Sequence, residues 1–216
     1  MADKPGADHW VPHDADIEQL RSAVPQCRGC ELWEPATQPV LSAGRTDAPL
    51  VLVGEQPGDQ EDRRGVPFVG PAGHLLQRAV EEAGIDRGSV YVTNAVKHFR
   101  FTERSTARGG VRRLHQTPDT AHVLACRPWL VAELRAVAPT VVVALGATAV
   151  RSLLGPDVKV MRDRGRPIER ETTRGTTTFV VTAHPSAVLR VPEDVREQAY
   201  GQLVADLRLA GSLVGG

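Results

Sequence analysis

Residues 49–54 read PLVLVG and lead directly into GEQPG, which ends at residue 58. A short apolar run bounded by turn residues is typical of a strand buried on both faces, as in a parallel sheet. Three further runs have the same character: 90–94 (VYVTN), 140–146 (TVVVALG) and 178–183 (TFVVTA). Helical patterns are expected over about 72–84, 119–138, 146–154 and 193–213. This alternation predicts an α/β fold, a three-layer α/β/α sandwich around a central four-stranded parallel sheet.

The composition narrows the classes of protein. A chain of 216 residues with 41% apolar and 24% charged residues suits one globular domain. No run of about 18 apolar residues is present, and the first residues lack the apolar core of a secretory signal, so a cytoplasmic protein away from membranes is expected. The 26 basic and 26 acidic residues exclude nucleic-acid binding by bulk charge alone. Three cysteines favour reduced thiols over a disulfide framework.

The chain divides into a tail and one domain. Residues 1–13 are expected to be flexible, and residues 14–216 to form a single domain whose first helix begins near Asp14 or Asp16. Residues 98–118 interrupt the strand and helix alternation with a basic segment. A loop of this length is usually functional, although a solvated, flexible insertion is the plain alternative.

Polar sequence follows each apolar run, namely GEQPGDQ, NAVKH, GATA and AHPS. The carboxyl ends of parallel strands meet at one edge of the sheet, where ligands of open α/β folds bind. We therefore expect these segments to gather into one site.

Four motifs occur in a fixed order: GEQPG at 54–58, PFVGPAG at 67–73, VTNAVK at 92–97 and AHPS at 183–186. Together they resemble the uracil-DNA glycosylase superfamily, and above all its iron–sulfur family four, over about residues 25–210. The resemblance implies a protein that flips uracil out of DNA and excises it. Two departures, Gln56 in place of alanine and a long basic loop ending RRLHQTP at 112–118, resemble the UdgX branch. That likeness implies single-turnover capture, in which His115 becomes covalently bonded to the abasic sugar.

The residues themselves suit that chemistry. Phe68 is suited to stacking on a flipped base, and Asn94 can read the Watson–Crick edge of uracil. His184 is placed to donate a hydrogen bond to the charge that develops on a uracil oxygen. Gln56 can contact the base or hold a water, while Glu55 can stabilise the cationic sugar or accept a proton from a nucleophile. Which of the last two residues performs which task is left open.

The basic loop carries the proposed nucleophile. Neutral imidazole at His115 can attack an oxocarbenium carbon, and the resulting bond has no easy leaving route. Arg112 and Arg113 are expected to grip flanking phosphates and to hold the loop closed. Amide groups near Gly70 and Gly73, at the start of a helix, are expected to bind a DNA phosphate.

Cys27 and Cys30 are separated by two residues, a spacing typical of metal ligands, and Cys126 is the third cysteine. The family-four resemblance implies a structural [4Fe–4S] cluster held by Cys27, Cys30, His98 and Cys126, with histidine where family four has its other cysteine. By residue type alone, a zinc ion on three cysteines and one histidine fits equally well.

Two alternative functions are considered beside uracil excision with covalent capture. One is a conventional multiple-turnover uracil-DNA glycosylase of family four, and the other is a non-catalytic iron–sulfur module that binds DNA. In each case the expected partner is uracil-containing DNA, with single strands preferred. We expect a monomer that acts in DNA repair or uracil sensing at the bacterial nucleoid.

Overall fold

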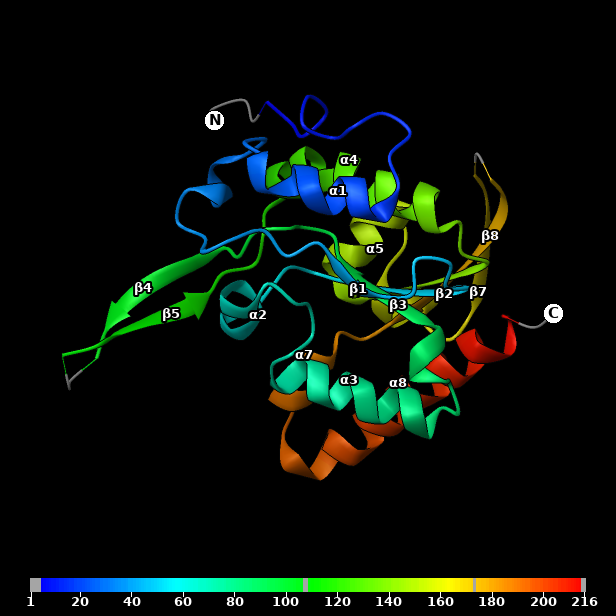
Figure 1. Ribbon diagram of the computed structural model, residues 1–216. Coiled ribbons are helices and arrows are strands. Elements are labelled where there is room, and N and C mark those ends of the chain that lie inside the picture. The colour runs from blue at the N-terminus through cyan, green and yellow to red at the C-terminus, as the bar shows by residue number, and fades with distance from the viewer. Residues whose placement is uncertain (1–4, 107–108, 173, 215–216) are drawn as a thin grey trace.

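The computed structural model describes residues 5–106, 109–172 and 174–214. Its central sheet has six strands in the order β1-β3-β2-β6-β8-β7 (Figure 1). The strands are β1 (Ser42–Gly44), β2 (Leu50–Gly54), β3 (Val90–Asn94), β6 (Val141–Leu145), β7 (Pro167–Thr172) and β8 (Gly175–Thr182). The four inner strands, β3, β2, β6 and β8, are mutually parallel. The predicted α/β fold and its four-stranded parallel centre are therefore confirmed.

The two edge strands were not predicted. Strand β1 pairs antiparallel with β3, and β7 pairs antiparallel with β8. Strand β1 has three residues, and β7 reads PIERET with side chains that are almost all exposed. Neither carries the apolar run that reveals a buried strand, because an edge strand has fewer neighbours to pack against.

Helices cover both faces of the sheet. The helices are α1 (Ile17–Ala23), α2 (Asp59–Arg64), α3 (Pro71–Glu82), α4 (Thr120–Val137), α5 (Gly146–Leu154), α6 (Val160–Asp163), α7 (Pro185–Arg190) and α8 (Glu193–Ser212), with short 3-10 turns at Val24–Gln26, Glu31–Trp33 and Arg87–Ser89. Helices α1, α4 and α5 form one layer, and α3, α7 and α8 form the other (Figure 1). Within the described residues, no helix is both long and apolar enough to cross a membrane.

The core is divided between the two sides of the sheet. Alternate side chains of β2 point to opposite faces, so Val51 and Val53 pack under α4 while Leu50 and Leu52 pack against α3 and α8. Each face therefore has its own apolar cluster, and the strands between them are buried on both sides. This packing holds the carboxyl ends of the parallel strands together at one edge of the sheet.

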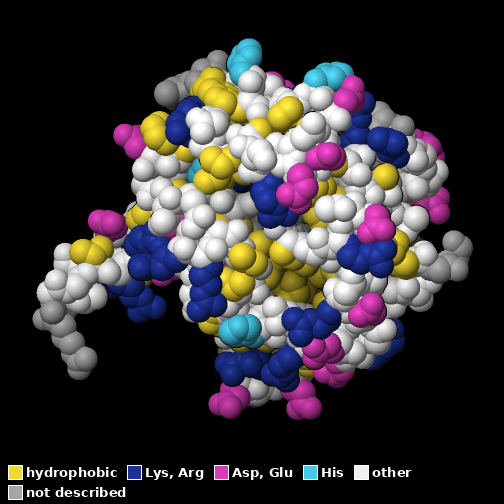
Figure 2. All heavy atoms as spheres, viewed as in Figure 1, with side chains coloured by type: hydrophobic (Ala, Val, Ile, Leu, Met, Phe, Trp, Pro, Cys, Tyr) yellow, Lys and Arg dark blue, Asp and Glu magenta, His cyan; other side chains and the backbone are white. Residues whose placement is uncertain are grey.

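The basic segment expected as a loop contains a hairpin. Strands β4 (Phe101–Ser105) and β5 (Val111–His115) pair antiparallel and project from the body of the molecule (Figure 1). The register places Phe101 opposite His115, so that the histidine lies at the base of the hairpin. Residues 107–108 lie outside the described residues. Figure 2 shows Lys and Arg side chains gathered where this hairpin leaves the body.

The N-terminal segment differs from the expected flexible tail. Ala7 is buried, and its N–H donates to the carbonyl of Ala125 at 2.8 Å. The N–H of Gly6 donates to the carbonyl of Gly29 at 3.1 Å. These contacts join residues 6 and 7 to the turn that carries the cysteine pair and to α4, while the division of the chain into a tail and one domain stays a prediction. Residues 1–4 lie outside the described residues.

Candidate active site

A cavity of about 910 Å³ opens at the carboxyl ends of the parallel strands. Three of the inner strands deliver a predicted residue to it, since Glu55 follows β2, Asn94 ends β3 and His184 follows β8. Thr148, in α5 after β6, also lines the cavity and was not predicted. His115 reaches the same cavity from the hairpin. The remaining predicted residues on its wall are Gln56, Phe68, Gly70, Arg112 and Arg113. The expected gathering of the strand ends into one site is therefore observed.

The floor of the cavity is tightly packed. Gly54 and Asn94 are neighbours across the parallel pair of β2 and β3. A methyl group on Gly54 would lie 2.4 Å from Oδ1 of Asn94 and 2.6 Å from the ring of Phe68. Only glycine therefore lets the amide and the aromatic ring approach the end of β2 together.

The backbone of Phe68 adopts an unusual conformation. Its φ angle is +57°, in the left-handed region that a bulky residue rarely occupies. Gly73 makes this possible, because a methyl group at that position would lie 1.9 Å from the carbonyl oxygen of Phe68. The ring of Phe68 lies 6.4 Å from that of His184 with an interplanar angle of 28°. Gly73 therefore allows the backbone of Phe68 to pack closely against it. The sequence predicted only a phosphate-binding role for Gly73.

His184 has one ring nitrogen already engaged. The backbone N–H of Ser186 donates to Nδ1 at 3.1 Å, so Nδ1 carries no hydrogen and Nε2 is the donor of the neutral ring. Burial lowers the pKa of His184 to about 4, against a smaller opposing effect of Glu55. The ring is therefore neutral at physiological pH and holds an Nε2–H that it can donate.

Glu55 links the strand end to the hairpin. Its Oε1 lies 3.3 Å from Nε2 of His115, and its Oε2 accepts a hydrogen bond of 2.6 Å from the hydroxyl of Thr148. Burial raises the pKa of Glu55, but the hydrogen bonds from His115 and Thr148 outweigh it, so the pKa lies below its usual value. Glu55 is thus a carboxylate at neutral pH, and it faces the imidazole.

Replacing Thr148 with valine tests this carboxylate. The change removes a donor to Glu55 while keeping the side-chain volume, so the pKa of Glu55 rises. Because Glu55 must be ionised to accept a proton, the acidic limb of the pH–rate profile for reaction with uracil-containing DNA should move to higher pH. At neutral pH, where Glu55 stays ionised, we expect little change in the rate. Thr140→Val, which removes a hydroxyl bonded to the carbonyl of Pro49, is the control and should leave the profile unchanged.

The Gln56 side chain makes hydrogen bonds that were not predicted. Its side-chain N–H groups donate to the carbonyls of Arg100 and Gln116 at 3.2 and 3.0 Å, and its Oε1 accepts from the N–H of Arg100 at 2.9 Å. Both residues flank the hairpin, so the amide ties the two ends of the hairpin to the end of β2. Since both of its N–H groups are engaged, the Gln56 side chain positions the hairpin, and a contact with the base or a water stays a prediction.

Arg113 also differs from the expected phosphate contact. Its Nε donates to Asp59 at 2.5 Å, and one terminal nitrogen donates to Asp62 at 2.7 Å. Its guanidinium lies over the ring of Phe101, 4.9 Å from the ring centroid. Arg113 therefore anchors the hairpin to α2, while Arg112 is exposed at the cavity wall and remains the candidate for a phosphate contact.

These two neighbouring arginines should separate binding from reaction. With Arg113→Gln, the hairpin loses its anchor, and we expect at least a tenfold slower reaction at saturating DNA with little change in the Kd. With Arg112→Gln, we expect a weaker Kd and a salt dependence reduced by about one unit of slope, with an unchanged rate at saturation. Single-turnover kinetics at several salt concentrations distinguish the two results. Equal effects of both substitutions on the rate at saturation would refute the assignment.

The expected phosphate site at Gly70 is also corrected. The N–H of Gly70 donates to Oε1 of Glu61 at 2.8 Å, and the N–H of Gly58 donates to Oε2 of the same carboxylate at 3.1 Å. The carboxylate thus occupies the place where a phosphate was expected, and it joins α2 to the start of α3. Gly70 serves this connection.

The four predicted metal ligands are all buried: Cys27, Cys30, His98 and Cys126. The three cysteines belong to the same apolar cluster of the core. Burial lowers the pKa of His98 to about 4, with Asp62 opposing the shift and Arg28, beside Cys27, adding to it. Burial raises the pKa of the Cys126 thiol to about 12. The histidine is therefore neutral and able to ligate, and a thiolate at Cys126 requires a cation beside it.

Two N–H groups already point at the sulfur atoms. The indole N–H of Trp129 donates to Sγ of Cys27 at 3.2 Å, and the backbone N–H of Lys97 donates to Sγ of Cys126 at 3.3 Å. Among the described residues, no group of three or more His, Cys, Asp or Glu side chains is close enough together to hold a metal ion. The buried donors and the N–H groups on sulfur fit a cluster.

Comparison with known proteins agrees with this geometry. Residues 41–208 match the family described as the uracil DNA glycosylase superfamily. The type-4 uracil-DNA glycosylase of Thermotoga maritima is 37% identical over 175 residues, which cover 81% of this chain and 83% of that protein. The type-4 enzyme of Archaeoglobus fulgidus is 30% identical over 92% of this chain and 94% of its own length. The type-5 enzyme of Pyrobaculum aerophilum is 32% identical over 64% of this chain. The chain therefore belongs to the uracil-DNA glycosylase superfamily and is similar to its type-4 members, as its motifs predicted.

Proposed function

We propose that this protein excises uracil from DNA and then remains covalently bonded to the abasic sugar through His115. The observation that carries the proposal is the pairing of His115 with the ionised Glu55, 3.3 Å apart, inside the cavity that also contains His184. The relatives named as uracil-DNA glycosylases support the substrate and the excision step. The covalent step rests on the hairpin and its histidine.

The cavity can recognise a flipped uracil through three side chains. The ring of Phe68 offers a face on which the base can stack, and the side-chain amide of Asn94 can pair with the uracil edge. The Nε2–H of His184 can donate to a uracil carbonyl oxygen, where negative charge develops as the glycosidic bond breaks. Because His184 is neutral, it can stabilise that charge without transferring a full proton.

The bond-breaking step leaves positive charge on the sugar. The electron pair of the glycosidic bond departs with uracil, and the carboxylate of Glu55 can stabilise the sugar cation that remains. A nitrogen lone pair of His115 then forms the new bond to the anomeric carbon. The imidazole becomes cationic in this step, and Glu55 can accept the proton that restores its neutrality. Uracil leaves as the anion, and the protein keeps the sugar.

The [4Fe–4S] cluster, when bound, would supply a structural crosslink and take no part in bond breaking. Cys27, Cys30, His98 and Cys126 are the residues that would hold it. His98 precedes the hairpin and Cys126 follows it, so the cluster would fix both ends of the hairpin to the N-terminal segment. Zinc remains the alternative by residue type.

Metal analysis tests the cluster. The purified protein should be brown and contain iron and inorganic sulfide, whereas Cys126→Ser should lose both and unfold at a lower temperature. His98→Cys, which provides a four-cysteine set, should keep the iron and serves as the control. Stoichiometric zinc in place of iron, or an unchanged iron content in Cys126→Ser, would contradict the proposed cluster.

A denaturing gel tests the function directly. The protein is incubated with uracil-containing single-stranded DNA, and a slowly migrating band that survives denaturation is expected. Free DNA that breaks in alkali would favour the second candidate, a multiple-turnover uracil-DNA glycosylase, which the names of the type-4 relatives favour. Intact DNA without the band would favour a module that only binds. Four further expectations stay predictions: the preference for single-stranded DNA, the monomeric state, the single domain and the role in DNA repair in the cytoplasm.

A further inference from the structure

Helix α4 is apolar on two opposite faces, but only one of them is covered. Its inner face is buried with Cys126, Trp129 and Leu130 in the core. On its outer face Leu124 is 61% exposed and Val131 is 49% exposed. Exposed leucine and valine side chains gain favourable free energy when a partner removes them from water. The outer face of α4 therefore has the composition of a surface that a partner covers.

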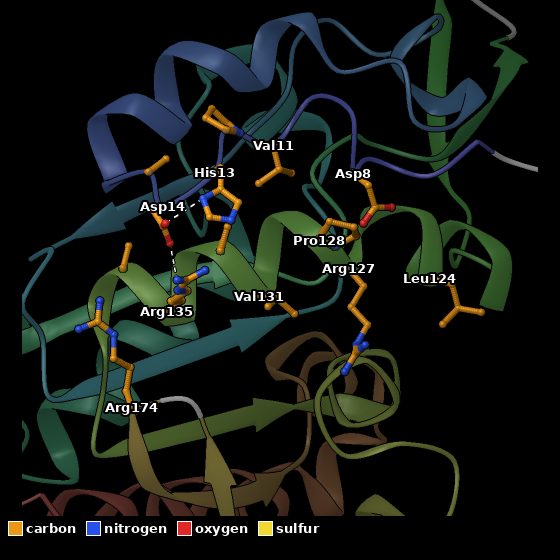
Figure 3. Close-up of a pocket in the computed structure, with 14 residues that line it drawn as sticks. Asp8, Val11, His13, Asp14, Leu124, Arg127, Pro128, Val131, Arg135 and Arg174 are labelled. Carbon is orange, nitrogen blue, oxygen red and sulfur yellow. Dashed lines mark ion pairs between the residues drawn. The ribbon is translucent and has the colours of Figure 1, made fainter.

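This outer face is hollowed into two adjoining cavities, of about 840 and about 320 Å³. The two cavities share Arg127, Val131, Arg135 and Arg174. We call the two together the α4 groove. Leu124 contributes to the larger cavity. Figure 3 shows Leu124, Pro128 and Val131 following one another along α4 on the side that faces the larger cavity.

The charge of the groove favours a particular partner. Asp14 is already engaged by His13 at 2.8 Å and by Arg135, as the dashed lines in Figure 3 show. Within the part of the chain that the structure describes, neither Arg127 nor Arg174 forms an ion pair. Nε of Arg127 donates to the carbonyl of Ser152 at 3.3 Å. Asp8 also lines the larger cavity, so the groove has two carboxylates, Asp8 and Asp14, against three guanidinium groups, Arg127, Arg135 and Arg174. This excess of positive charge favours a partner that carries carboxylates.

The spacing of the stripe indicates the shape of the partner. Residues 124, 128, 131 and 135 recur at intervals of four, three and four, which is the spacing that one helix presents to another. Pro128 has no N–H, so it cannot donate to the carbonyl of Leu124 within the helix. A helix with apolar side chains along one stripe and carboxylates beside it would fill both cavities and meet both arginines.

We propose that the α4 groove binds an acidic amphipathic helix of a partner protein. The groove shares no residue with the cavity that contains His115 and Glu55, so a partner can be held while DNA is bound. The proposal does not depend on how that cavity reacts with uracil.

The test uses a fluorescein-labelled peptide in which leucines recur at helical spacing among glutamates. Fluorescence anisotropy with the full-length protein should show saturable binding that weakens as salt is added. Val131→Glu should weaken binding at least about tenfold, because it places a charge in the apolar stripe. Arg174→Glu should also weaken binding. Val195→Glu, at a valine of similar exposure on α8, is the matched control and should bind as the native protein does.

Four results would overturn the proposal. The first is the absence of saturable binding, and the second is equal binding by the Val131→Glu and Val195→Glu proteins. The third is a concentration-dependent dimer in sedimentation that Val131→Glu abolishes, which would make a second copy of this chain the occupant. Reaction with uracil-containing DNA should be the same in both variants, and loss of that reaction in Val131→Glu alone would assign the groove to DNA instead.

Discussion

Replacement of His115 with alanine should abolish the denaturant-resistant complex with uracil-containing DNA and should release uracil over many turnovers. His115 lies in the cavity opposite Glu55, and its side chain is 42% exposed. Removing the ring leaves a space that water can enter next to the sugar. Water then takes the place of imidazole at the cationic carbon, and the product dissociates because no bond joins it to the protein. The rest of the catalytic set remains in place.

The measurement combines a denaturing gel with an assay of released uracil. In the native protein, released uracil should stop at one equivalent, and mass spectrometry should find a deoxyribose adduct on His115. In His115→Ala, the adduct should be absent, and uracil should exceed the protein concentration. His9→Ala, at an exposed histidine of the N-terminal segment, is the control and should behave as the native protein does. A resistant band that persists in His115→Ala would refute the assignment of the nucleophile.

Replacement of Gly54 with alanine should reduce uracil excision about a hundredfold in a protein that remains folded. The added methyl group would lie 2.4 Å from Oδ1 of Asn94 and 2.6 Å from the ring of Phe68. One or both side chains must move, and a displacement of about an ångström at a reacting site costs about a hundredfold in rate. Overpacking at this buried position should also cost about 1–3 kcal/mol of stability.

Gly201→Ala is the matched control for this experiment. It lies within α8, and a methyl group there meets no atom within 4 Å. Alanine in a helix is favoured over glycine by about 1 kcal/mol, so the control should be as active and slightly more stable. Single-turnover excision and thermal unfolding are measured for both variants. Full activity of Gly54→Ala would show that the close approach of Asn94 and Phe68 to Gly54 is not needed for excision.

The sequence predicted the buried strands and the helices between them closely, because each buried strand is a short run of consecutive apolar residues. The run at 90–94 is β3 to the residue, and the predicted helix at 146–154 is α5. The four motif segments meet at the strand ends because parallel strands place their carboxyl ends on one edge. The edge strand β1 was missed because it has only three residues, and β7 and the hairpin were missed because their side chains are mostly exposed and show no buried pattern.

Several functional residues carried no signal in the sequence. Thr148 donates to Glu55 across 93 residues of chain, and Asp62 accepts from Arg113 across 51. A threonine in a helix and an acidic residue in a short helix are common, so only their three-dimensional neighbours reveal their roles. Glu61, which takes the amides of Gly58 and Gly70, was missed for the same reason.

By itself, the sequence determined the α/β framework, the edge of the sheet where the cavity lies and most of the side chains that line it, because buried strands and their turns are specified by neighbouring residues. Only the tertiary structure showed which side chains of the site contact one another. It assigned Gln56 and Arg113 to holding the hairpin, Gly73 to seating Phe68, and Glu55 to facing His115. Hydrogen bonds and ion pairs of this kind join residues that are distant along the chain, and their partners are fixed only when packing brings the elements together.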